Sequence, residues 1–444
     1  MMIDSCRVWI LSSLVLLSFT FISHSFLSQE TLEKQIPKNV RIGLEHTTEG
    51  FQPCEPSIAI SQKNPDIIIA GSILDNVYRS TDGGHTWKQK TLQSSYGVYG
   101  DPCVVSSPNG DFYFLHLSDP EGKGWSSDML LDRIVCQHSS NKGKSWSDGG
   151  SIGLEHPKDQ DKEWAVVTSD GETIHACWTQ FDKYDSHAIE DSTIILCSFS
   201  DRKANHWSKP VRISEKAGDC LDDDETTEGA VPSVGPNDEL YVAWAVDESI
   251  MFDRSYDGGN TWLNQDIKAA DMVGGWAQTV ESIGRVNGMP VTAVDLAPES
   301  KHNGRIYINW TDDRNGADDL DVFLCYSDNN GDSWSNPVRV NDDGPGKQQF
   351  FTWMAVDSSD GSIHIVFYDR RAHNDATTDV YVASSFDGGE TFVNLQVSET
   401  PFLPQGKVFF GDYNNISAVD GHVRPIWTRE VDGILTIMTA IIDF

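Results

Sequence analysis

Residues 80–87 read STDGGHTW, an octapeptide that returns along the chain in closely similar form. Full copies are SSNKGKSW at 139–146, SYDGGNTW at 255–262, SDNNGDSW at 327–334 and SFDGGETF at 385–392, and a worn copy is SDRKANHW at 200–207. Repeats that recur at intervals of this size are typical of solenoids and propellers. The octapeptide therefore decides the fold of the whole chain.

Each copy has the composition of a tight turn between two strands. Asp or Asn followed by Gly is the strongest short hairpin signal, because such turns need a backbone with positive φ. The Asp or Asn side chain can also bind backbone N–H groups of its own turn. The closing Trp is large and apolar, and it suits a pocket between neighbouring sheets. We therefore predict that the octapeptide is a structural clasp on a β-hairpin rather than a calcium or sugar site.

Two strand patterns recur between the clasps. A short inner strand appears seven times, at 56–60, 102–105, 164–167, 231–234, 290–294, 353–356 and 415–419. A second strand ends in an aromatic residue, at 174–178, 241–244, 306–310, 363–368 and 423–427. Seven inner strands predict seven four-stranded blades, with 39–43 as the outer strand that closes the last blade. If the first blade is not a full sheet, the count falls to six.

The pattern S-x-[DN]-x-G-x-[ST]-W resembles the Asp box of the bacterial neuraminidase repeat (BNR) family. The resemblance extends over nearly the whole chain after its first 28 residues. It implies an all-β fold, a single β-propeller over 29–444 with Asp-box hairpins. Sialidases of this family have six blades, so a count of seven is a departure from them.

The N-terminal segment predicts export. An apolar run at 8–22 is followed by small residues at the positions that a signal peptidase reads. The run is short for a membrane span, and no second run follows it in the sequence. We expect residues 1–28 to be a secretory signal peptide with a short tail, and the mature protein to be secreted or periplasmic.

The net charge of the chain argues against one class of binding partner. A formal net charge of −34 argues against nucleic acid, whose phosphates need a basic face. The acidic stretch 221–225 is predicted to be a solvated loop, with a structural calcium ion as the alternative. No other cofactor is expected, since the sequence has no Cys/His zinc spacing. The oligomeric state is left open.

Seven of the eight cysteines follow the predicted signal peptide, so at least one thiol stays unpaired within the chain. Cys136, Cys197 and Cys325 fall at matching places on predicted strands, where we expect them to be buried as small hydrophobes. Cys54 and Cys103 begin neighbouring inner strands and are the pair considered for a disulfide.

Propeller geometry gathers polar residues at one mouth of the central channel, where inner strands start and second strands end. Before the inner strands stand Glu55, Asp101, Asp161, Lys162, Glu163, Glu228, Asp412 and Tyr413. After the second strands stand Asp312, Asp313, Arg314, Asp369, Arg370, Arg371, Arg429 and Glu430, and Arg285 lies in the loop before blade five. Arginines suit bidentate recognition of a carboxylate, and nearby carboxyl groups can act as acid or base.

This set resembles the sialidase site, in which three arginines hold the substrate carboxylate, an aspartate is the acid/base and a glutamate activates a tyrosine nucleophile. The resemblance implies that Tyr413 is the nucleophile, Glu228 its partner and Asp101 the acid. The implied carboxylate-binding triad is Arg314, Arg370 and Arg429. Sialidases also carry an Arg-Ile-Pro phrase near the mature N-terminus, and the nearest phrase here, VRIG at 40–43, lacks the proline.

Each of these residues has a structural alternative. Asp–Arg pairs at strand ends often form salt bridges that brace a loop, which applies to Arg314 and Arg371. Tyr413 can equally be a packing residue in the channel.

Three functions remain open from the sequence. The leading one is exo-hydrolysis of a terminal acidic sugar from glycans by an exo-α-sialidase-like glycoside hydrolase. The second is a uronic-acid polysaccharide lyase, with His46, His116 or His373 near the mouth as a candidate base. The third is a non-catalytic propeller that binds a glycan or a protein.

Overall fold

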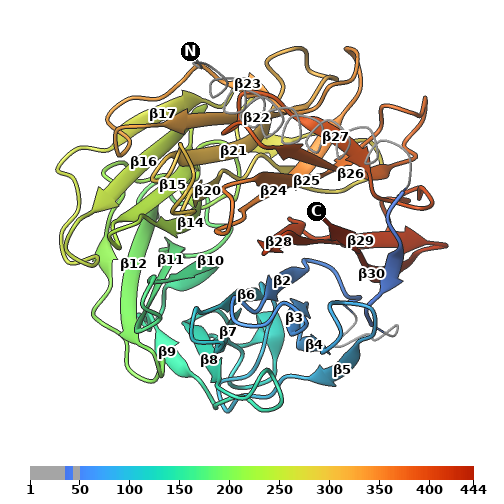
Figure 1. The fold of residues 1–444 in the computed structure, drawn as a ribbon. Coiled ribbons are helices and arrows are strands. Elements are labelled where there is room, and N and C mark those ends of the chain that lie inside the picture. The colour runs from blue at the N-terminus through green and yellow to red at the C-terminus, as the bar shows by residue number, and fades with distance from the viewer. Residues whose placement is uncertain (1–35, 44–50) are drawn as a thin grey trace, which may run out of the picture.

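The computed structural model describes residues 36–43 and 51–444, and its fold is a seven-bladed β-propeller. The sheets stand around a common centre (Figure 1). The described residues form strands and loops, with one short 3-10 helix among them, η1 (Gly124–Ser126). The prediction of seven four-stranded blades is confirmed, and the six-bladed alternative is wrong. The predicted signal peptide, residues 1–28, lies outside the described residues.

Blades one to four each contain four strands in sequence order. Blade one contains β2 (Ser57–Ile60), β3 (Ile68–Ser72), β4 (Asn76–Ser80) and β5 (Lys88–Thr91). Blade two contains β6 (Cys103–Ser106), β7 (Phe112–Leu117), β8 (Ile134–Ser139) and β9 (Gly150–Ile152). Blade three contains β10 (Asp159–Val167), β11 (Thr173–Phe181), β12 (Thr193–Asp201) and β13 (Val211–Arg212). Blade four contains β14 (Glu228–Val234), β15 (Leu240–Val246), β16 (Ser249–Ser255) and β17 (Ile267–Asp271).

A small hairpin that the sequence did not predict, β18 (Ala277–Gln278) and β19 (Val286–Asn287), precedes blade five. Blade five contains β20 (Val291–Val294), β21 (Ile306–Asp312), β22 (Asp321–Ser327) and β23 (Val338–Arg339). Blade six contains β24 (Gln349–Val356), β25 (Ile363–Asp369), β26 (Asp379–Ser385) and β27 (Val393–Gln396). Blade seven contains β28 (Asn415–Val419), β29 (His422–Val431), β30 (Ile434–Ala440) and β1 (Asn39–Arg41), and β31 (Ile442–Asp443) pairs with β29. Within the described ranges, no helix is both long and apolar enough to cross a membrane.

The last blade is completed by a strand from the start of the described chain. β1 pairs antiparallel with β30, and Val40 lies opposite Thr439. The side-chain amide of Asn39 also donates to the carbonyl of Val397, at 2.6 Å, which ties the closing strand to blade six. Inner strands of neighbouring blades contact one another around the whole ring, including β28 with β2. The predicted closure by 39–43 is therefore confirmed.

The octapeptide forms the hydrogen-bonded turn that its composition predicts. In the first copy, the hydroxyl oxygen of Ser80 accepts the N–H of Gly84 at 2.9 Å. The carboxylate of Asp82 accepts the N–H of Thr86 at 2.9 Å and its hydroxyl at 2.6 Å, and the indole of Trp87 donates to the Gly84 carbonyl at 2.9 Å. In two other copies an Asn side-chain oxygen accepts the equivalent N–H bond. The clasp is thus held by side chains of the repeat itself.

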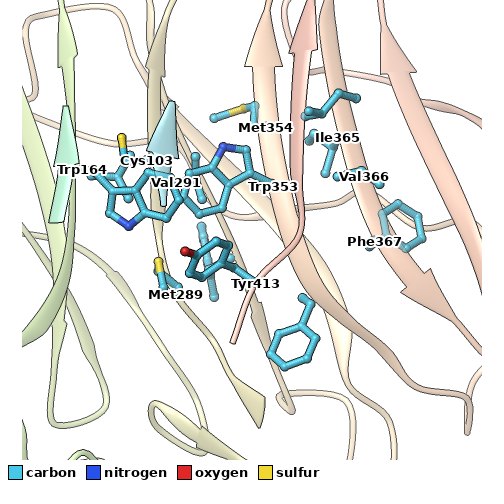
Figure 2. Packing of buried hydrophobic residues seen from close by; sticks show 14 of the residues in the cluster. Cys103, Trp164, Met289, Val291, Trp353, Met354, Ile365, Val366, Phe367 and Tyr413 are labelled. Atoms are coloured by element: carbon cyan, nitrogen blue, oxygen red, sulfur yellow. The ribbon is translucent and has the colours of Figure 1, made fainter. Parts of the chain in front are cut away.

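Aromatic side chains fill the centre of the molecule. The aromatic-ending second strands bury their tryptophans almost completely, at Trp178, Trp244, Trp310 and Trp427. Where the inner strands meet, Trp164, Trp353 and Tyr413 pack together from blades three, six and seven (Figure 2). The ring centroid of Trp164 lies 4.1 Å from that of Trp353 and 5.1 Å from that of Tyr413. The channel is therefore packed by rings from three blades below its mouth.

The cysteines differ from the expectation in two respects. Cys197 is buried as expected, but it lies opposite Cys177 on β11 and β12 and forms a disulfide with it, so the expectation that it is not disulfide-bonded is wrong. Cys54 and Cys103 are buried free thiols, so the disulfide considered between them is not formed. Burial of the free thiols of Cys136 and Cys325 is confirmed.

The clasps should make a stability contribution that depends on pH. The carboxylate of Asp387 accepts the N–H of Thr391 at 3.0 Å and the hydroxyl of Ser385 at 2.8 Å. Burial acts to raise the pKa of Asp387, but these hydrogen bonds outweigh it and the pKa lies below its ordinary value. The contribution is therefore present above about pH 4 and is lost as the pH falls through the lowered pKa.

We expect Asp387→Ala to lower the free energy of unfolding at pH 7 by about 1 kcal/mol, because a turn then loses its acceptor. Asp387→Asn should cost less, since Asn fills this position in two natural copies. Denaturant unfolding at pH 7 and pH 3 measures both effects, and the deficit of Asp387→Ala should shrink at pH 3. An equal deficit at both pH values would contradict the charge-assisted account.

Candidate functional site

A pocket of about 390 Å³ opens at the end of the ring where the inner strands begin. Its charged lining comes from blades one to three and from the loop between β18 and β19, and consists of Glu55, Asp101, Asp161, Lys162 and Arg285. The sequence placed all five at one mouth of the channel, and that placement is confirmed. Aromatic and aliphatic side chains form the rest of the wall.

Left-handed backbone recurs where the inner strands begin. Glu55 (φ 52°), Asp101 (φ 47°), Lys162 (φ 55°) and Phe351 (φ 51°) all have positive φ although none is glycine. β10, β14 and β24 also carry a bulge at this point. Such backbone costs about 1 kcal/mol or more at a residue with a side chain, and it clusters at functional sites. The same backbone conformation therefore recurs at the start of four inner strands around the mouth.

Asp412 joins the two cations of the mouth. It is 1% exposed, and its carboxylate accepts the Nε–H of Arg285 at 2.8 Å and the ammonium of Lys162 at 3.1 Å. Arg285 also pairs with Asp222, and Lys162 lies 3.6 Å from Asp161. Burial acts to raise the pKa of Asp412, but the charges of Arg285 and Lys162 outweigh it, so the pKa lies below its ordinary value. Both cations of the pocket are thus already paired with carboxylates.

The pKa of Asp101 is shifted in the opposite direction from that of Asp412. Burial, followed by the charge of Asp161, raises the pKa of Asp101 to about 8. The cation Lys162 acts in the other direction without offsetting these effects. Asp101 therefore carries its proton at neutral pH while Asp412 is ionised. A protonated carboxyl group that faces an open pocket has the property a general acid needs.

Two more carboxyl groups lie out of contact with solvent. Glu163 is 1% exposed and Glu228 is fully buried. Burial raises the pKa of both well above the ordinary value, with Asp101 adding to the effect on Glu163 and Asp222 adding to that on Glu228. Burial disfavours the charged form of a carboxyl group. These two groups therefore favour the neutral form, which limits the negative charge of the mouth.

The apolar wall of the pocket carries exposed aromatic rings. Trp125, within η1, is 65% exposed, and its ring centroid lies 5.6 Å from that of Tyr184. Phe409 is 40% exposed, and the guanidinium of Arg285 lies 5.6 Å from its ring centre. Sequence reasoning missed these rings because they lie in long loops outside the repeat. An isolated Trp in the polar stretch GKGWSS at 122–127 was the available signal.

Tyr413 lies beneath the pocket in the aromatic core. Its hydroxyl is 3.5 Å from the carbonyl oxygen of Pro102, and burial, followed by the charge of Asp101, raises its pKa well above the ordinary value. The structure thus brings Tyr413 and Asp101 to the same end of the channel. Glu228 instead neighbours Asp222, and no hydrogen bond joins it to Tyr413 in the described chain. The roles of nucleophile, partner and acid stay predictions.

The three arginines of the predicted triad stand on three different blades, and none lines the pocket that holds Asp101. Arg314 donates to Asp312 at 2.8 Å and so braces the end of β21. Arg370 lines a second hollow. Arg429 lies on β29, where its Nε is buried without a hydrogen-bond partner among the described residues. The structure does not gather the three around Asp101, and their carboxylate-binding role stays a prediction.

The histidines considered for a lyase are placed differently from one another. His116 is fully buried, which lowers its pKa to about 4. His373 lines the second hollow, with Nε2 2.8 Å from the carboxylate of Asp379. His46 lies outside the described residues. Within residues 36–43 and 51–444, no set of three or more His, Cys, Asp or Glu side chains is arranged to hold a metal ion.

Known proteins similar to this chain include several that act on carbohydrate. No family model matches the chain. It is 24% identical over 405 residues to the xyloglucanase Xgh74A of Acetivibrio thermocellus, a match that covers 86% of this chain. The chain spans 39% of the length of that curated relative.

Among solved structures, the Hadza microbial sialidase Hz136 is 13% identical, with a TM-score of 0.48 and coverage of 86% of this chain and 75% of the sialidase. The α-L-arabinanase of Penicillium chrysogenum is 14% identical, with a TM-score of 0.47 and coverage of 79% of this chain and 98% of the arabinanase. From its own strand order the chain is a seven-bladed β-propeller, and the proteins to which it is similar include sialidases and other BNR-type propellers.

Proposed function

We propose that the protein is a glycoside hydrolase whose active site is the pocket at the channel mouth, with Asp101 as the proton donor. One observation carries the proposal: a carboxyl group with a pKa of about 8 faces a pocket walled by exposed aromatic rings. Glycosidic bonds break when an acid protonates the leaving oxygen and a second group acts on the sugar from the other side. Asp101 meets the first need at neutral pH.

The second carboxyl group is Asp161. It lines the same pocket and lies 3.6 Å from the ammonium of Lys162. Burial raises the pKa of Asp161, and Lys162 acts against that rise. Lys162 is therefore a positioning residue that favours the ionised form of Asp161. Glycoside hydrolysis uses a protonated acid together with a second carboxyl group whose ionised form is favoured, and Lys162 provides that bias at Asp161.

The aromatic wall supports a sugar as the substrate. Sugar rings have apolar C–H faces that pack on aromatic rings, and Trp125 and Phe409 offer exposed faces at the pocket. The carboxyl groups at the other side can accept hydrogen bonds from sugar hydroxyls. The pocket therefore joins an apolar wall to polar groups, as ligand sites generally do.

An uncharged sugar suits this pocket better than an acidic one. Lys162 and Arg285 are already paired with Asp412, and Asp161 and Asp222 lie beside them. A substrate carboxylate would meet these groups without an unpaired cation to hold it. The sequence predicts more narrowly that a terminal acidic sugar is released. That prediction depends on the three arginines outside this pocket, and it is tested separately with sialylated glycans in the assay below.

We also propose that the protein acts outside the cytoplasm. The predicted signal peptide at 1–28 supports this, and so does the disulfide between Cys177 and Cys197, since disulfides persist in oxidising compartments.

Asp101→Asn should abolish most hydrolysis, because the variant cannot donate a proton. We expect kcat to fall by about 10²–10⁴-fold with little change in KM. The measurement is sugar release, by mass spectrometry, from neutral β-glucan, xyloglucan and arabinan oligosaccharides and from sialylated glycans. Glu390→Gln, an exposed change on the last clasp at the opposite face, is the matched control and should keep full activity. Undiminished activity in Asp101→Asn would overturn the assignment, and binding without any product would favour the non-catalytic propeller.

The pH dependence of hydrolysis should report the same proton. Because Asp101 must be protonated, kcat/KM should fall as the pH rises through about 8. Aryl glycosides with good leaving groups need little protonation and should lose this alkaline limb. A limb that persists unchanged with such substrates would assign it to another group.

The stability of the folded protein should also depend on pH through the ionisation of Asp101. Between its unfolded pKa near 4 and its folded pKa of about 8, the folded state binds the additional proton, so its stability falls as the pH rises through this window. Asp101→Asn removes this dependence, and its Tm should exceed that of the wild type by roughly a few degrees at pH 9. A lower Tm for Asp101→Asn at pH 9 would contradict the raised pKa.

A further inference from the structure

A second hollow of about 390 Å³ lies beside the mouth pocket, across the loop of the β18–β19 hairpin. Thr279 and Glu281 of this loop line the second hollow, whereas Gly284 and Arg285 line the pocket that holds Asp101. The two spaces are therefore neighbours with separate linings. The far wall of the second hollow is formed by Lys347, Gln348, Arg370, His373 and Asp375.

Arg370 is a buried cation without a counter-ion. It is 5% exposed, and no ion pair joins it to a carboxylate in the described part of the chain. Burial lowers its pKa to about 10, although the charges of Glu281 and Asp375 act in the other direction. The next residue, Arg371, forms ion pairs with Asp369 and Asp342. In a chain with 67 acidic and 33 basic residues, a buried arginine that makes no ion-pair contact with a described carboxylate needs an explanation.

The hydrogen bonds of Arg370 leave room for a ligand. Its guanidinium donates to the carbonyl of Glu281 at 2.7 Å, to the hydroxyl of Thr378 at 3.2 Å and to the side-chain oxygen of Gln348 at 3.3 Å. Each of the three nitrogens makes one of these bonds. An arginine has five N–H donors, so one donor on each terminal nitrogen is unused. Two donors on one guanidinium are what a carboxylate accepts in a bidentate pair.

Lys347 supplies a second cation at the same hollow. Its ammonium donates to the side-chain oxygen of Asn374 at 3.0 Å and to the carbonyl of His373, and the described residues offer it no carboxylate partner. Three acidic residues, Glu281, Asp318 and Asp375, stand on the rim and are exposed to solvent. These rim charges oppose a multiply charged ligand such as phosphate, so a single negative charge suits the hollow better.

We propose that the second hollow is a binding site for a monocarboxylate, such as the carboxylate of a uronic acid unit, held by Arg370 and Lys347. The carboxylate pairs with the two unused donors of Arg370 and lies near the ammonium of Lys347. The site does not depend on hydrolysis at Asp101. A glycan with an acidic unit can bind there whether or not the neighbouring pocket is catalytic.

Calorimetric titration of the full chain with glucuronate, and with glucose as the uncharged comparison, tests the site. We expect saturable binding of glucuronate with a Kd of about a millimolar, weakened by added salt, and no binding of glucose at this site. Arg370→Gln should weaken glucuronate binding by about tenfold or more, because the forked pair is lost. Arg370→Lys keeps the charge without the fork and should fall between the two.

Arg212→Gln is the control, since Arg212 is an exposed arginine on β13 that donates to the carbonyls of Ser214 and Glu215 and does not line the second hollow. It should bind glucuronate as the wild type does. Asp101→Asn should also keep this affinity, which separates the result from that of the proposed hydrolysis. Equal affinity for glucose and glucuronate, or wild-type binding by a folded Arg370→Gln, would overturn the site.

Discussion

Antiparallel pairing of β1 with β30 closes the ring, and the arrangement of the mouth depends on that closure. The seven inner strands contact one another in a full circle, in which β28 of the last blade lies between β24 and β2. The antiparallel strand order within each blade places the inner-strand starts at one end and the Asp-box hairpins at the other, and closure brings the first and last blades side by side. Residues separated by more than 300 positions, such as Glu55 and Asp412, thereby share one hydrogen bond of 3.1 Å.

The mouth holds more carboxyl groups than it can keep ionised. Asp412 keeps its charge because Arg285 and Lys162 both bind it, whereas burial holds a proton on Asp101 and favours the neutral forms of other acids nearby. Removing charges from water costs several kcal/mol per ion unless partners compensate. The distribution of protons among these groups is therefore a consequence of burial and pairing, which lower the pKa of Asp412 and raise that of Asp101 at the same mouth.

The fold could be predicted from the sequence because its signals are local. The side chains of each octapeptide form hydrogen bonds within that octapeptide. The strand order is enough to predict that the polar residues before the inner strands lie at the mouth. Contacts that depend on loops could not be predicted. Arg314 is held by Asp312 two residues away, and Arg370 is held by a hairpin that carries no repeat signal. The disulfide between Cys177 and Cys197 could be predicted only from the register of β11 against β12, and the spacing of the cysteines in the sequence does not give that register.

Left-handed backbone at the inner-strand starts has a consequence for how such a site changes over time. Glu55, Asp101, Lys162 and Phe351 occupy equivalent positions in four blades, and Gly229 occupies the same position in a fifth. These positions share one backbone conformation, whereas their side chains differ: two are acidic, one is basic, one is aromatic and glycine has none. A nearly symmetric scaffold thus presents an asymmetric surface through single residues. Exchange of a few of them can alter the ligand of the mouth while the strand order and the hairpins on the opposite face stay as they are.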